Sequence, residues 1–396
     1  MSDTLSRSCL SDMAVAMRGH VARGAVAGMV TLVAQGEDVR AEAFGLADLD
    51  SGAQMRRDSI IRIASMTKPM LAVVALTMVE DGLIGLDESV ERWLPELADR
   101  RVLRSIEYPL DDTEPARRAI TLRDLLTLRL GIGAIMQPPG RYPIQQAMQE
   151  AGVAPGPLNP TVPPDEWIAQ LASLPLVHQP GEGWMYHTGF DVLAVLLARI
   201  AGQPLDDVMQ ERLFGPLGMV DTGFHAPPEK LGRLASTYVR DAETGRLSLF
   251  DPAAGGAYAG RQAFPCEVVS TADDVLVFAR MLLACGRHGG RRILSRPLVE
   301  EMTRDQIAPA QKAVSPFFPG FWETTGWGFG LGIVIRPDDL SPEPGSYGWE
   351  GGLGTSLSID PRRDLVTIFL SQRLMQSPDD VDIAREFQRL AYRAIA

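Results

Sequence analysis

Strand-forming segments lie near both ends of this 396-residue chain, and helix-forming segments lie between them. Near the N-terminus, residues 26–34 form an almost continuous apolar run, and residues 39–44 alternate apolar with polar side chains. Alternation is typical of a half-buried strand, whereas a continuous apolar run is typical of a strand buried on both faces. The two segments therefore predict a hairpin that turns at residues 35–38, with its first strand covered on both sides.

Three more strands are predicted near the C-terminus, at residues 326–335, 345–360 and 364–372. Turns at 336–344 and 361–363 separate them. Strands from the two ends are best joined in one antiparallel sheet, with the helical middle inserted as a second lobe. We therefore expect an α+β fold in which residues 1–62 and 320–396 form a sheet lobe with flanking helices, and residues 63–319 form a mainly helical lobe.

Helical spacing of apolar residues marks several segments. The first lies in the N-terminal region, where charges interrupt the apolar residues, so we interpret it as an amphipathic helix and not as a signal peptide. Further helices are predicted at residues 121–131, 191–202, 271–286 and 378–396. Thr121 and Asp124 have the spacing of a capping box. Residues 132–180 are rich in Pro, Gly and Gln and poorly periodic, which predicts a functional or lid-like loop region.

Composition excludes several classes of function. The formal net charge is −12, and no basic stripe with interleaved aromatic residues suggests a nucleic-acid partner. The three cysteines and five histidines show neither a disulfide framework nor metal-ligand spacing, and no glycine motif would cradle a phosphate. No segment is apolar for long enough to cross a bilayer. We therefore expect a cytoplasmic protein with no metal, no organic cofactor, and no membrane or nucleic-acid partner; its oligomeric state is left open.

The segment IRIASMTKPM at residues 61–70 places a serine and a lysine three residues apart where an apolar helix begins. Because Pro69 is tolerated only in the first helical turn, the helix is predicted to start near Ser65 or Met66. Lys68 then lies on the same face as the Ser65 hydroxyl, within its reach. Burial and the helix dipole would lower the pKa of this amine, which could then activate the serine as a nucleophile. The alternative is that Ser65 caps the helix and Lys68 points to solvent.

The residues around this pair resemble the nucleophile motif of the serine beta-lactamase/penicillin-binding-protein superfamily. The resemblance is closest to the class C-like branch that contains the family VIII carboxylesterases. Besides RIASMTKPM it rests on collinear segments that together span about residues 25–375, namely GLADLDSGAQMRRDSIIRIAS, MVEDGLIGLDESVERWLPEL, ITLRDLLTLRLG, PGEGWMYHTGFDVLAVLLARIAG, LFGPLGMVDTGF, VVSTADDVLVFARML and GWEGGLGTSLSIDP. It implies a beta-lactamase/transpeptidase-like fold, with an α/β sheet lobe beside a helical lobe and the active site at their junction.

The resemblance assigns roles to residues in two of the motifs. Ser65 and Lys68 match the nucleophile and its amine, and Tyr186 of YHT matches the tyrosine of the family's Tyr-x-Asn or Tyr-x-Ser motif. Tyr186 would then shuttle protons, which a phenol does only if a cation such as Lys68 stabilises the phenolate. Thr188 stands where the family has Asn or Ser. It either contacts substrate or caps the following helix, with Asp191 three residues on, and we favour the cap.

A third motif is Trp349–Glu350–Gly351, which aligns with the Lys-Thr-Gly triplet of beta-lactamases and peptidases. Family VIII esterases commonly have a Trp-x-Gly form here. The triplet's cation, which attracts the carboxylate of a beta-lactam, is absent, and an acid stands in the middle. Trp349 and Glu350 are expected to face opposite ways along a strand, so only one need line the pocket. The resemblance also makes the backbone N–H groups of Ser65 and Gly352 the two oxyanion donors.

These residues predict a serine carboxylesterase that hydrolyses short-chain or small-molecule esters through an acyl-enzyme on Ser65. Amide or beta-lactam hydrolysis and acyl transfer use the same residues and stay as alternatives, as does a catalytically silent binding protein on this scaffold. Whether Lys68 or Tyr186 is the base is left open, because the two are expected to titrate as a coupled pair. The aromatic residues of segment 309–327 are interpreted mainly as packing, with an apolar acyl or alcohol pocket as the alternative.

Overall fold

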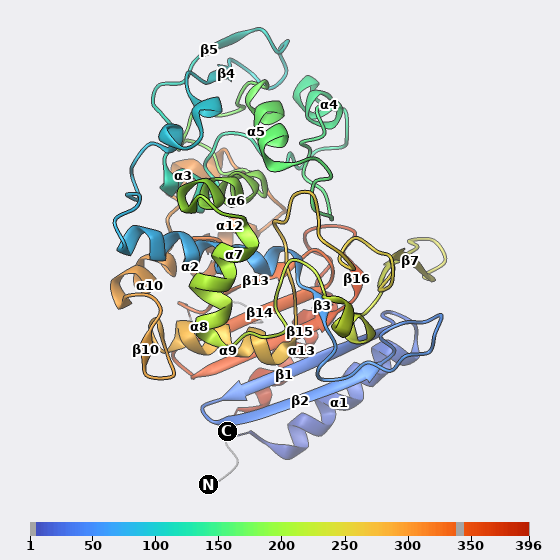
Figure 1. The fold of residues 1–396 in the computed structure, drawn as a ribbon. Helices are drawn as coiled ribbons and strands as arrows, with labels where there is room; N and C mark the ends of the chain where they lie inside the picture. The colour runs from blue at the N-terminus through green and yellow to red at the C-terminus, as the bar shows by residue number, and fades with distance from the viewer. Residues whose placement is uncertain (1–4, 338–343, 396) are drawn as a thin grey trace.

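The computed structural model describes residues 5–337 and 344–395. A seven-stranded antiparallel sheet lies in the lower half of the view in Figure 1. In spatial order its strands are β11 (Thr325–Trp327), β12 (Gly332–Val334), β13 (Tyr347–Gly351), β14 (Thr355–Asp360), β15 (Leu365–Ser371), β1 (Gly28–Gln35) and β2 (Asp38–Gly45). Strand β1 pairs with β15 so that Met29 faces Ser371. The two ends of the chain therefore share one sheet, which confirms the predicted α+β fold.

Two segments that were predicted as single strands are hairpins. Residues 326–335 divide into β11 and β12, and residues 345–360 divide into β13 and β14. The turns lie at Gly330, with φ of +75°, and Gly354, with φ of +88°. This left-handed region is open to glycine at little cost. The predicted turn at 336–344 falls mostly outside the described residues.

Helices cover both faces of the sheet. On one face lie α1 (Arg7–Ala22) and α13 (Asp382–Ala394), which pack on each other and, in Figure 1, on the side of β1 and β2 away from the other helices. Met29 and Val33 of β1 join this layer, whereas Val30, Leu32 and Ala34 face the larger core on the opposite side. Strand β1 is thus buried on both faces, as its continuous apolar run predicted.

The larger core contains α2 (Thr67–Glu80), α6 (Thr188–Ala201) and α9 (Ala272–Leu283). Helix α2 is buried from its first residue to Met78 and packs against α6. Helix α9 packs on β15 and β1, although it belongs to the segment assigned from the sequence to the helical lobe. The two-lobe division of the chain therefore stays a prediction.

Other predicted elements differ from the structure in their extent. Helix α3 (Leu122–Leu126) is shorter than the predicted helix at 121–131, because Leu128 adopts a left-handed φ of +57°. The predicted loop region at 132–180 contains two helices, α4 (Pro143–Glu150) and α5 (Pro164–Ala172), whose apolar faces join the core. The amphipathic pattern of each helix is too short to stand out from its Pro-rich and Gly-rich surroundings.

Shorter elements complete the described part of the chain. The helices are α7 (Leu205–Met209), α8 (Gly215–Leu217), α10 (Arg296–Met302), α11 (Pro309–Ala313), α12 (Phe321–Thr324), η1 (Ala64–Met66), η2 (Val90–Arg92), η3 (Pro95–Leu97), η4 (Gln210–Phe214) and η5 (Pro228–Arg233). The strands are β3 (Ile61–Arg62), β4 (Arg101–Leu103), β5 (Thr113–Pro115), β6 (Thr237–Arg240), β7 (Leu247–Asp251), β8 (Val269–Ser270), β9 (Arg287–His288), β10 (Arg291–Arg292) and β16 (Arg373–Leu374). Within the described ranges, no helix is both long and apolar enough to span a bilayer.

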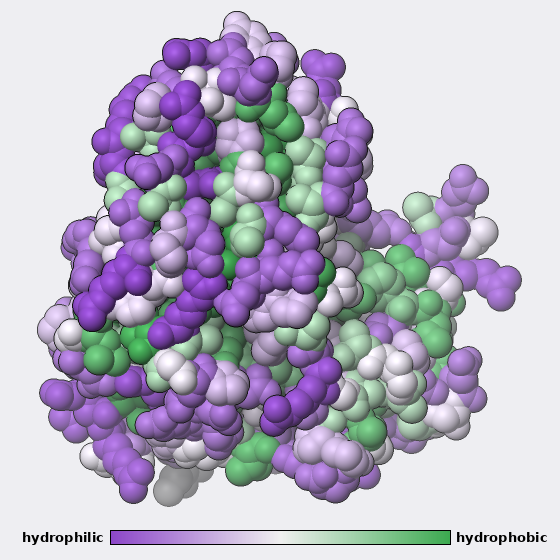
Figure 2. Space-filling view, turned by 45° about the horizontal axis from the view of Figure 1, so that its top comes forward, coloured by the Kyte–Doolittle hydropathy of each residue, from purple (hydrophilic) through white to green (hydrophobic). Residues whose placement is uncertain are grey.

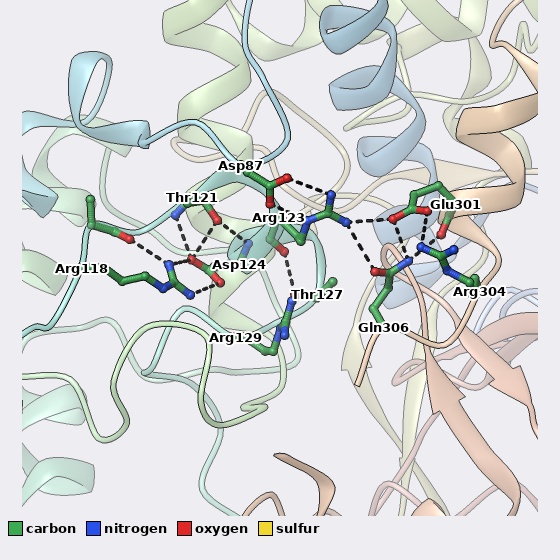
Figure 3. Close-up of polar contacts among 11 residues, drawn as sticks. Asp87, Arg118, Thr121, Arg123, Asp124, Thr127, Arg129, Glu301, Arg304 and Gln306 are labelled. Carbon is green, nitrogen blue, oxygen red and sulfur yellow. Dashed lines mark hydrogen bonds and ion pairs between the residues drawn. The ribbon is translucent and has the colours of Figure 1, made fainter. Parts of the chain in front are cut away.

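Ion pairs anchor the short helix α3 (Figure 3). Thr121 and Asp124 form the predicted capping box, and Arg118 pairs with the same Asp124 carboxylate. Arg123 donates hydrogen bonds to Asp87 at 2.6 Å and to Glu301 of α10 at 2.9 Å. Helix α3 is thereby tied to the loop after α2 and to the end of α10.

Most of the face shown in Figure 2 is hydrophilic. Hydrophobic side chains gather in the hollow between the upper helical part and the projection at the right, which is the position of β7 in Figure 1.

Strand β7 supplies one member of a buried ion pair. Arg62 of β3 contacts Asp251 at 2.5 Å, and both side chains are almost inaccessible to water. Arg62 additionally donates hydrogen bonds to the carbonyls of Ala235 and Pro252.

We predict that Arg62→Met lowers the free energy of unfolding by about 3–5 kcal/mol, because it leaves the Asp251 carboxylate buried without its counter-charge. The matched control is Arg56→Met, which removes an arginine from an exposed pair with Asp58 and should cost less than about 1 kcal/mol. Urea denaturation of both variants measures the difference. Equal effects of the two substitutions would contradict the prediction.

Candidate active site

Ser65 and Lys68 are held together and buried. Ser65 lies in η1, which leads directly into α2, so the predicted helix start is confirmed to within two residues. The Lys68 ammonium Nζ donates a hydrogen bond to Ser65 Oγ at 2.9 Å. Ser65 is 6% exposed and Lys68 3% exposed. The interpretation in which Lys68 points to solvent is therefore wrong.

Backbone contacts on both sides fix the position of the serine. Strand β3 pairs with β8, and the Ile63 N–H donates to the Val268 carbonyl at 3.1 Å. The Val268 N–H in turn donates to Thr67 Oγ1 at 3.0 Å. Gly351 approaches so closely that an added Cβ would lie 2.2 Å from the Ile63 carbonyl oxygen. This glycine is thus required for close packing against the turn that carries Ser65.

Tyr186 reaches the same point from a distant part of the chain. The Lys68 ammonium lies 5.1 Å from the centre of the Tyr186 ring. Trp349 of β13 donates its indole N–H to the Tyr186 hydroxyl at 2.5 Å. The Tyr186 backbone is held by hydrogen bonds between the Met185 N–H and the Leu128 carbonyl and between the Ala134 N–H and the Tyr186 carbonyl. The structure therefore brings Ser65, Lys68, Tyr186 and Trp349 together.

The pKa of Lys68 differs from the sequence-based expectation because carboxylates lie near its amine. Burial lowers the pKa of Lys68, but Tyr186, Glu267 and Asp191 raise it, and the net result lies above its usual value. The expected lowering of this pKa is therefore wrong, because the local sequence shows neither carboxylate beside the amine. Burial raises the pKa of Tyr186, and the Lys68 charge lowers it; the net pKa is raised.

Sequence reasoning missed Glu267 entirely. Its carboxylate Oε1 lies 3.8 Å from Lys68 Nζ, and both side chains are buried. Asp191 had been considered only for helix capping, yet its carboxylate is buried within the electrostatic reach of Lys68. Its oxygen Oδ2 lies 3.4 Å from Nε2 of His187, whose pKa burial lowers well below the usual value. The only sequence signal for Glu267 is its place directly before the VVST segment.

Thr188 does not cap α6. The helix starts at Thr188 itself, and the residue before it is His187, whose φ is +82°. The Thr188 side chain is 0% exposed, and its hydroxyl has no hydrogen-bond partner among the described residues. The cap prediction is therefore wrong by one residue. The side chain also does not border the cavity described below, so a substrate contact would require it to move.

Trp349 and Glu350 face opposite sides of the sheet, as strand alternation predicted. Trp349 points toward Tyr186, whereas Glu350 lies near Arg385 of α13, whose charge lowers a Glu350 pKa that burial raises. Strand β12 pairs with β13 only at Tyr347 and Gly348. The end of β13 from Trp349 to Gly351 is thus uncovered by β12, which leaves this edge open to the site.

A cavity of about 1020 Å³ opens beside this edge. Its lining includes Ser65, Tyr186, Glu267, Trp349, Gly352 and the aromatic residues Phe317, Phe318 and Phe321. Phe317 and Phe321 also pack against Trp184, so these aromatic side chains both fill the core and border the cavity. The N–H groups of Ser65 and Gly352 donate no hydrogen bond within residues 5–337 and 344–395. In the same ranges no group of three or more His, Cys, Asp or Glu side chains is arranged to hold a metal ion.

Comparisons with known proteins agree with this geometry. The family model described as Beta-lactamase matches residues 13–391. The chain belongs to the beta-lactamase family. Protein Rv1367c of Mycobacterium tuberculosis is 38% identical over 367 residues, which cover 88% of this chain and 86% of the relative. Esterase EstB of Burkholderia gladioli is 32% identical over 370 residues, covering 87% and 85%. This family membership, with its esterase relative, identifies the chain as a serine hydrolase.

Among solved structures, EstCE1, titled a hydrolase with promiscuous acyltransferase activity, superposes with a TM-score of 0.81 at 24% identity. The match covers 98% of this chain and 99% of the other. At this identity the likeness establishes the beta-lactamase/transpeptidase fold, and the residues of the site carry the rest of the argument.

The Asp191 carboxyl gives this site a measurable pH dependence. Burial raises its pKa from 3.8 to about 7. Between pH 3.8 and about 7 the unfolded chain releases the Asp191 proton, whereas the folded chain keeps it. The protonated carboxyl therefore contributes its full share to the free energy of unfolding below pH 3.8, and this contribution is lost as the pH rises to about 7. The loss is on the order of 4 kcal/mol.

We predict that Asp191→Asn flattens the fall of unfolding free energy between pH 4 and 8 relative to the wild type. Urea titrations at several pH values measure both slopes. Asp273→Asn, which removes an exposed carboxylate paired with Arg57, serves as the control and should keep the wild-type slope. Parallel curves for wild type and Asp191→Asn would contradict the raised pKa.

Proposed function

We propose that this chain is a carboxylesterase that hydrolyses small-molecule esters through an acyl-enzyme on Ser65. The observation that carries the proposal is the buried hydrogen bond from Lys68 to Ser65 at 2.9 Å, at the edge of a cavity that Tyr186 also borders. A hydroxyl, an amine and a phenol in contact at a cavity form the arrangement that nucleophilic acyl transfer requires. The relative named Esterase EstB adds support for ester chemistry.

The proposed reaction has two halves. Ser65 Oγ attacks the ester carbonyl carbon, and its proton passes to the Lys68–Tyr186 pair. The N–H groups of Ser65 and Gly352 stabilise the oxyanion. The bond to the alcohol then breaks, the pair returns the proton to the leaving oxygen, and water releases the acyl group from Ser65 in the second half. Trp349 supports this role of Tyr186, because its indole N–H stabilises negative charge on the phenol oxygen.

Charge favours neutral esters over beta-lactams as substrates. Trp349 offers no cation where a beta-lactam carboxylate would need one. The carboxylate that borders the cavity beside the serine is Glu267, since Glu350 lies near Arg385 on the other face of the sheet. A buried carboxylate repels an anionic ligand strongly where water is scarce. The aromatic lining suits an apolar acyl or alcohol group.

We propose that this esterase belongs to family VIII, because its third motif has the Trp-x-Gly form. We propose the cytoplasm as its location. In support, α1 has a buried apolar face that packs on α13 and β2, as expected of an integral part of the fold. A small-molecule ester is the proposed partner.

We predict that the purified protein turns over a short-chain nitrophenyl ester at least about 100-fold faster than a chromogenic cephalosporin, a difference of about 2.7 kcal/mol in barrier. The physical reason is the missing cation at Trp349 and the carboxylate at Glu267. Comparison of the two kcat/KM values tests this. A cephalosporin rate equal to or above the ester rate would overturn the assignment in favour of lactam hydrolysis.

The covalent intermediate is a separate prediction. Intact-mass spectrometry after mixing with an activated ester should show one added acyl group on the wild type and none on Ser65→Ala. The same measurement with an alcohol acceptor present separates hydrolysis from acyl transfer. An acylated Ser65→Ala would refute the role of Ser65.

A further inference from the structure

The proposed mechanism gives no role to Glu267, an ionisable side chain at the centre of the site. Glu267 borders the same cavity as Ser65, and its carboxylate lies 3.8 Å from the Lys68 ammonium. Burial raises the pKa of Glu267, the Lys68 charge and the Ser65 hydroxyl lower it, and the net pKa lies above its usual value. A carboxylate is expensive to bury, so one found beside a nucleophile is a candidate for a part in the chemistry.

The backbone holds Glu267 in fixed relation to the nucleophile. The carbonyl of the next residue, Val268, accepts a hydrogen bond from the Ile63 N–H. The Val268 N–H donates a hydrogen bond to the Thr67 hydroxyl. These two contacts lie on either side of Ser65 in the chain. Strands β3 and β8 extend the same pairing through Arg62 and Val269. Glu267, just before β8, and Ser65, just after β3, are therefore both held by the pairing of these two strands, as precise catalysis requires.

Glu267 is the carboxylate that borders the cavity beside the serine and its lysine. Lys68 and Tyr186 contact each other and take the serine proton in the first half of the proposed reaction. Asp191, whose pKa is about 7, does not border the cavity. Glu350 borders it from the opposite face of the sheet, near Arg385.

We propose that Glu267 is a further catalytic residue, whose carboxylate binds and deprotonates the water that hydrolyses the acyl group on Ser65. The inference rests on the proposed esterase function and extends it to the second half-reaction. General base catalysis of this kind contributes about 10²–10⁴-fold to a rate.

The step balances as follows. A water oxygen held by Glu267 forms a bond to the acyl carbonyl carbon while one water proton moves to the carboxylate. The tetrahedral intermediate collapses, the bond between the acyl carbon and Ser65 Oγ breaks, and Glu267 gives its proton to the departing serine oxygen. The products are the free carboxylic acid and the regenerated hydroxyl, and no oxidant, reductant or further reactant is needed.

The test is pre-steady-state kinetics of Glu267→Gln with a nitrophenyl ester. Glutamine keeps the size of the side chain and removes its basicity. We expect the initial burst of nitrophenol to stay within about 5-fold of the wild-type rate, while steady-state turnover falls by about 100-fold or more. Intact-mass spectrometry should then show the acyl-enzyme accumulating in the variant. Glu37→Gln, which removes an exposed carboxylate from the turn between β1 and β2, is the matched control and should behave as wild type.

Hydroxylamine separates lost base catalysis from a distorted site. This nucleophile attacks an acyl ester without needing a carboxylate base, so it should release the trapped acyl group from Glu267→Gln as a hydroxamate and restore turnover. Glu267→Asp, which keeps a base on a shorter side chain, should recover part of the steady-state rate. Circular dichroism and thermal melting establish that each variant is folded.

Three outcomes would overturn the inference. The first is steady-state turnover of Glu267→Gln within about 3-fold of wild type. The second is a burst rate that falls as much as the turnover, and the third is an acyl-enzyme that hydroxylamine fails to release. A wild type that never acylates Ser65 would refute the esterase proposal itself and this inference with it. The burst phase thus distinguishes failure of the proposed function from failure of the role of Glu267.

Discussion

The Lys68 ammonium is buried among apolar helices, and the structure around it depends on how that charge is accommodated. A buried, unpaired ammonium would cost several kcal/mol. Lys68 is instead bonded to Ser65, lies beside the carboxylate of Glu267 and approaches the ring of Tyr186. The same contacts that make the charge tolerable bring a hydroxyl, a phenol and a carboxylate to one cavity. Each residue that contacts the amine also borders the cavity, so the burial of the charge and the arrangement of the site depend on the same contacts.

Much of the fold follows from the sequence because long, strongly patterned segments dominate it. The apolar run of β1 and the periodicity of α2, α6 and α9 identified elements that the structure contains. Prediction failed where elements are short and their limits depend on single residues. The turns at Gly330 and Gly354 interrupt runs whose apolar pattern continues across them, and the left-handed Leu128 ends α3 early. Local pattern does not reveal such conformations, since tertiary packing selects them.

At the site, sequence reasoning was strongest where residues lie close together in the chain. The three-residue spacing of Ser65 and Lys68 predicted their hydrogen bond from helix geometry alone. Tyr186 and Trp349 were suggested only by resemblance, because nothing local connects them to the serine. The only signal for Glu267 was its place directly before the VVST segment. The pairing of β8 with β3, between segments distant in the chain, brings Glu267 next to Lys68. Tyr186, Glu267 and Asp191 together raise the Lys68 pKa, which the sequence had predicted to be lowered.

The pairing of β1 with β15 has a consequence for biosynthesis. Met29 needs Ser371 opposite it, so the hairpin of β1 and β2 leaves the ribosome long before its neighbour in the sheet has been made. During that interval one edge of β1, rich in Val and Leu, offers unsatisfied backbone groups, which is the usual template for aggregation. Contacts so distant in sequence also slow folding, because a large loop must close first. The β15-facing edge of β1 therefore stays without its partner strand until synthesis is almost complete.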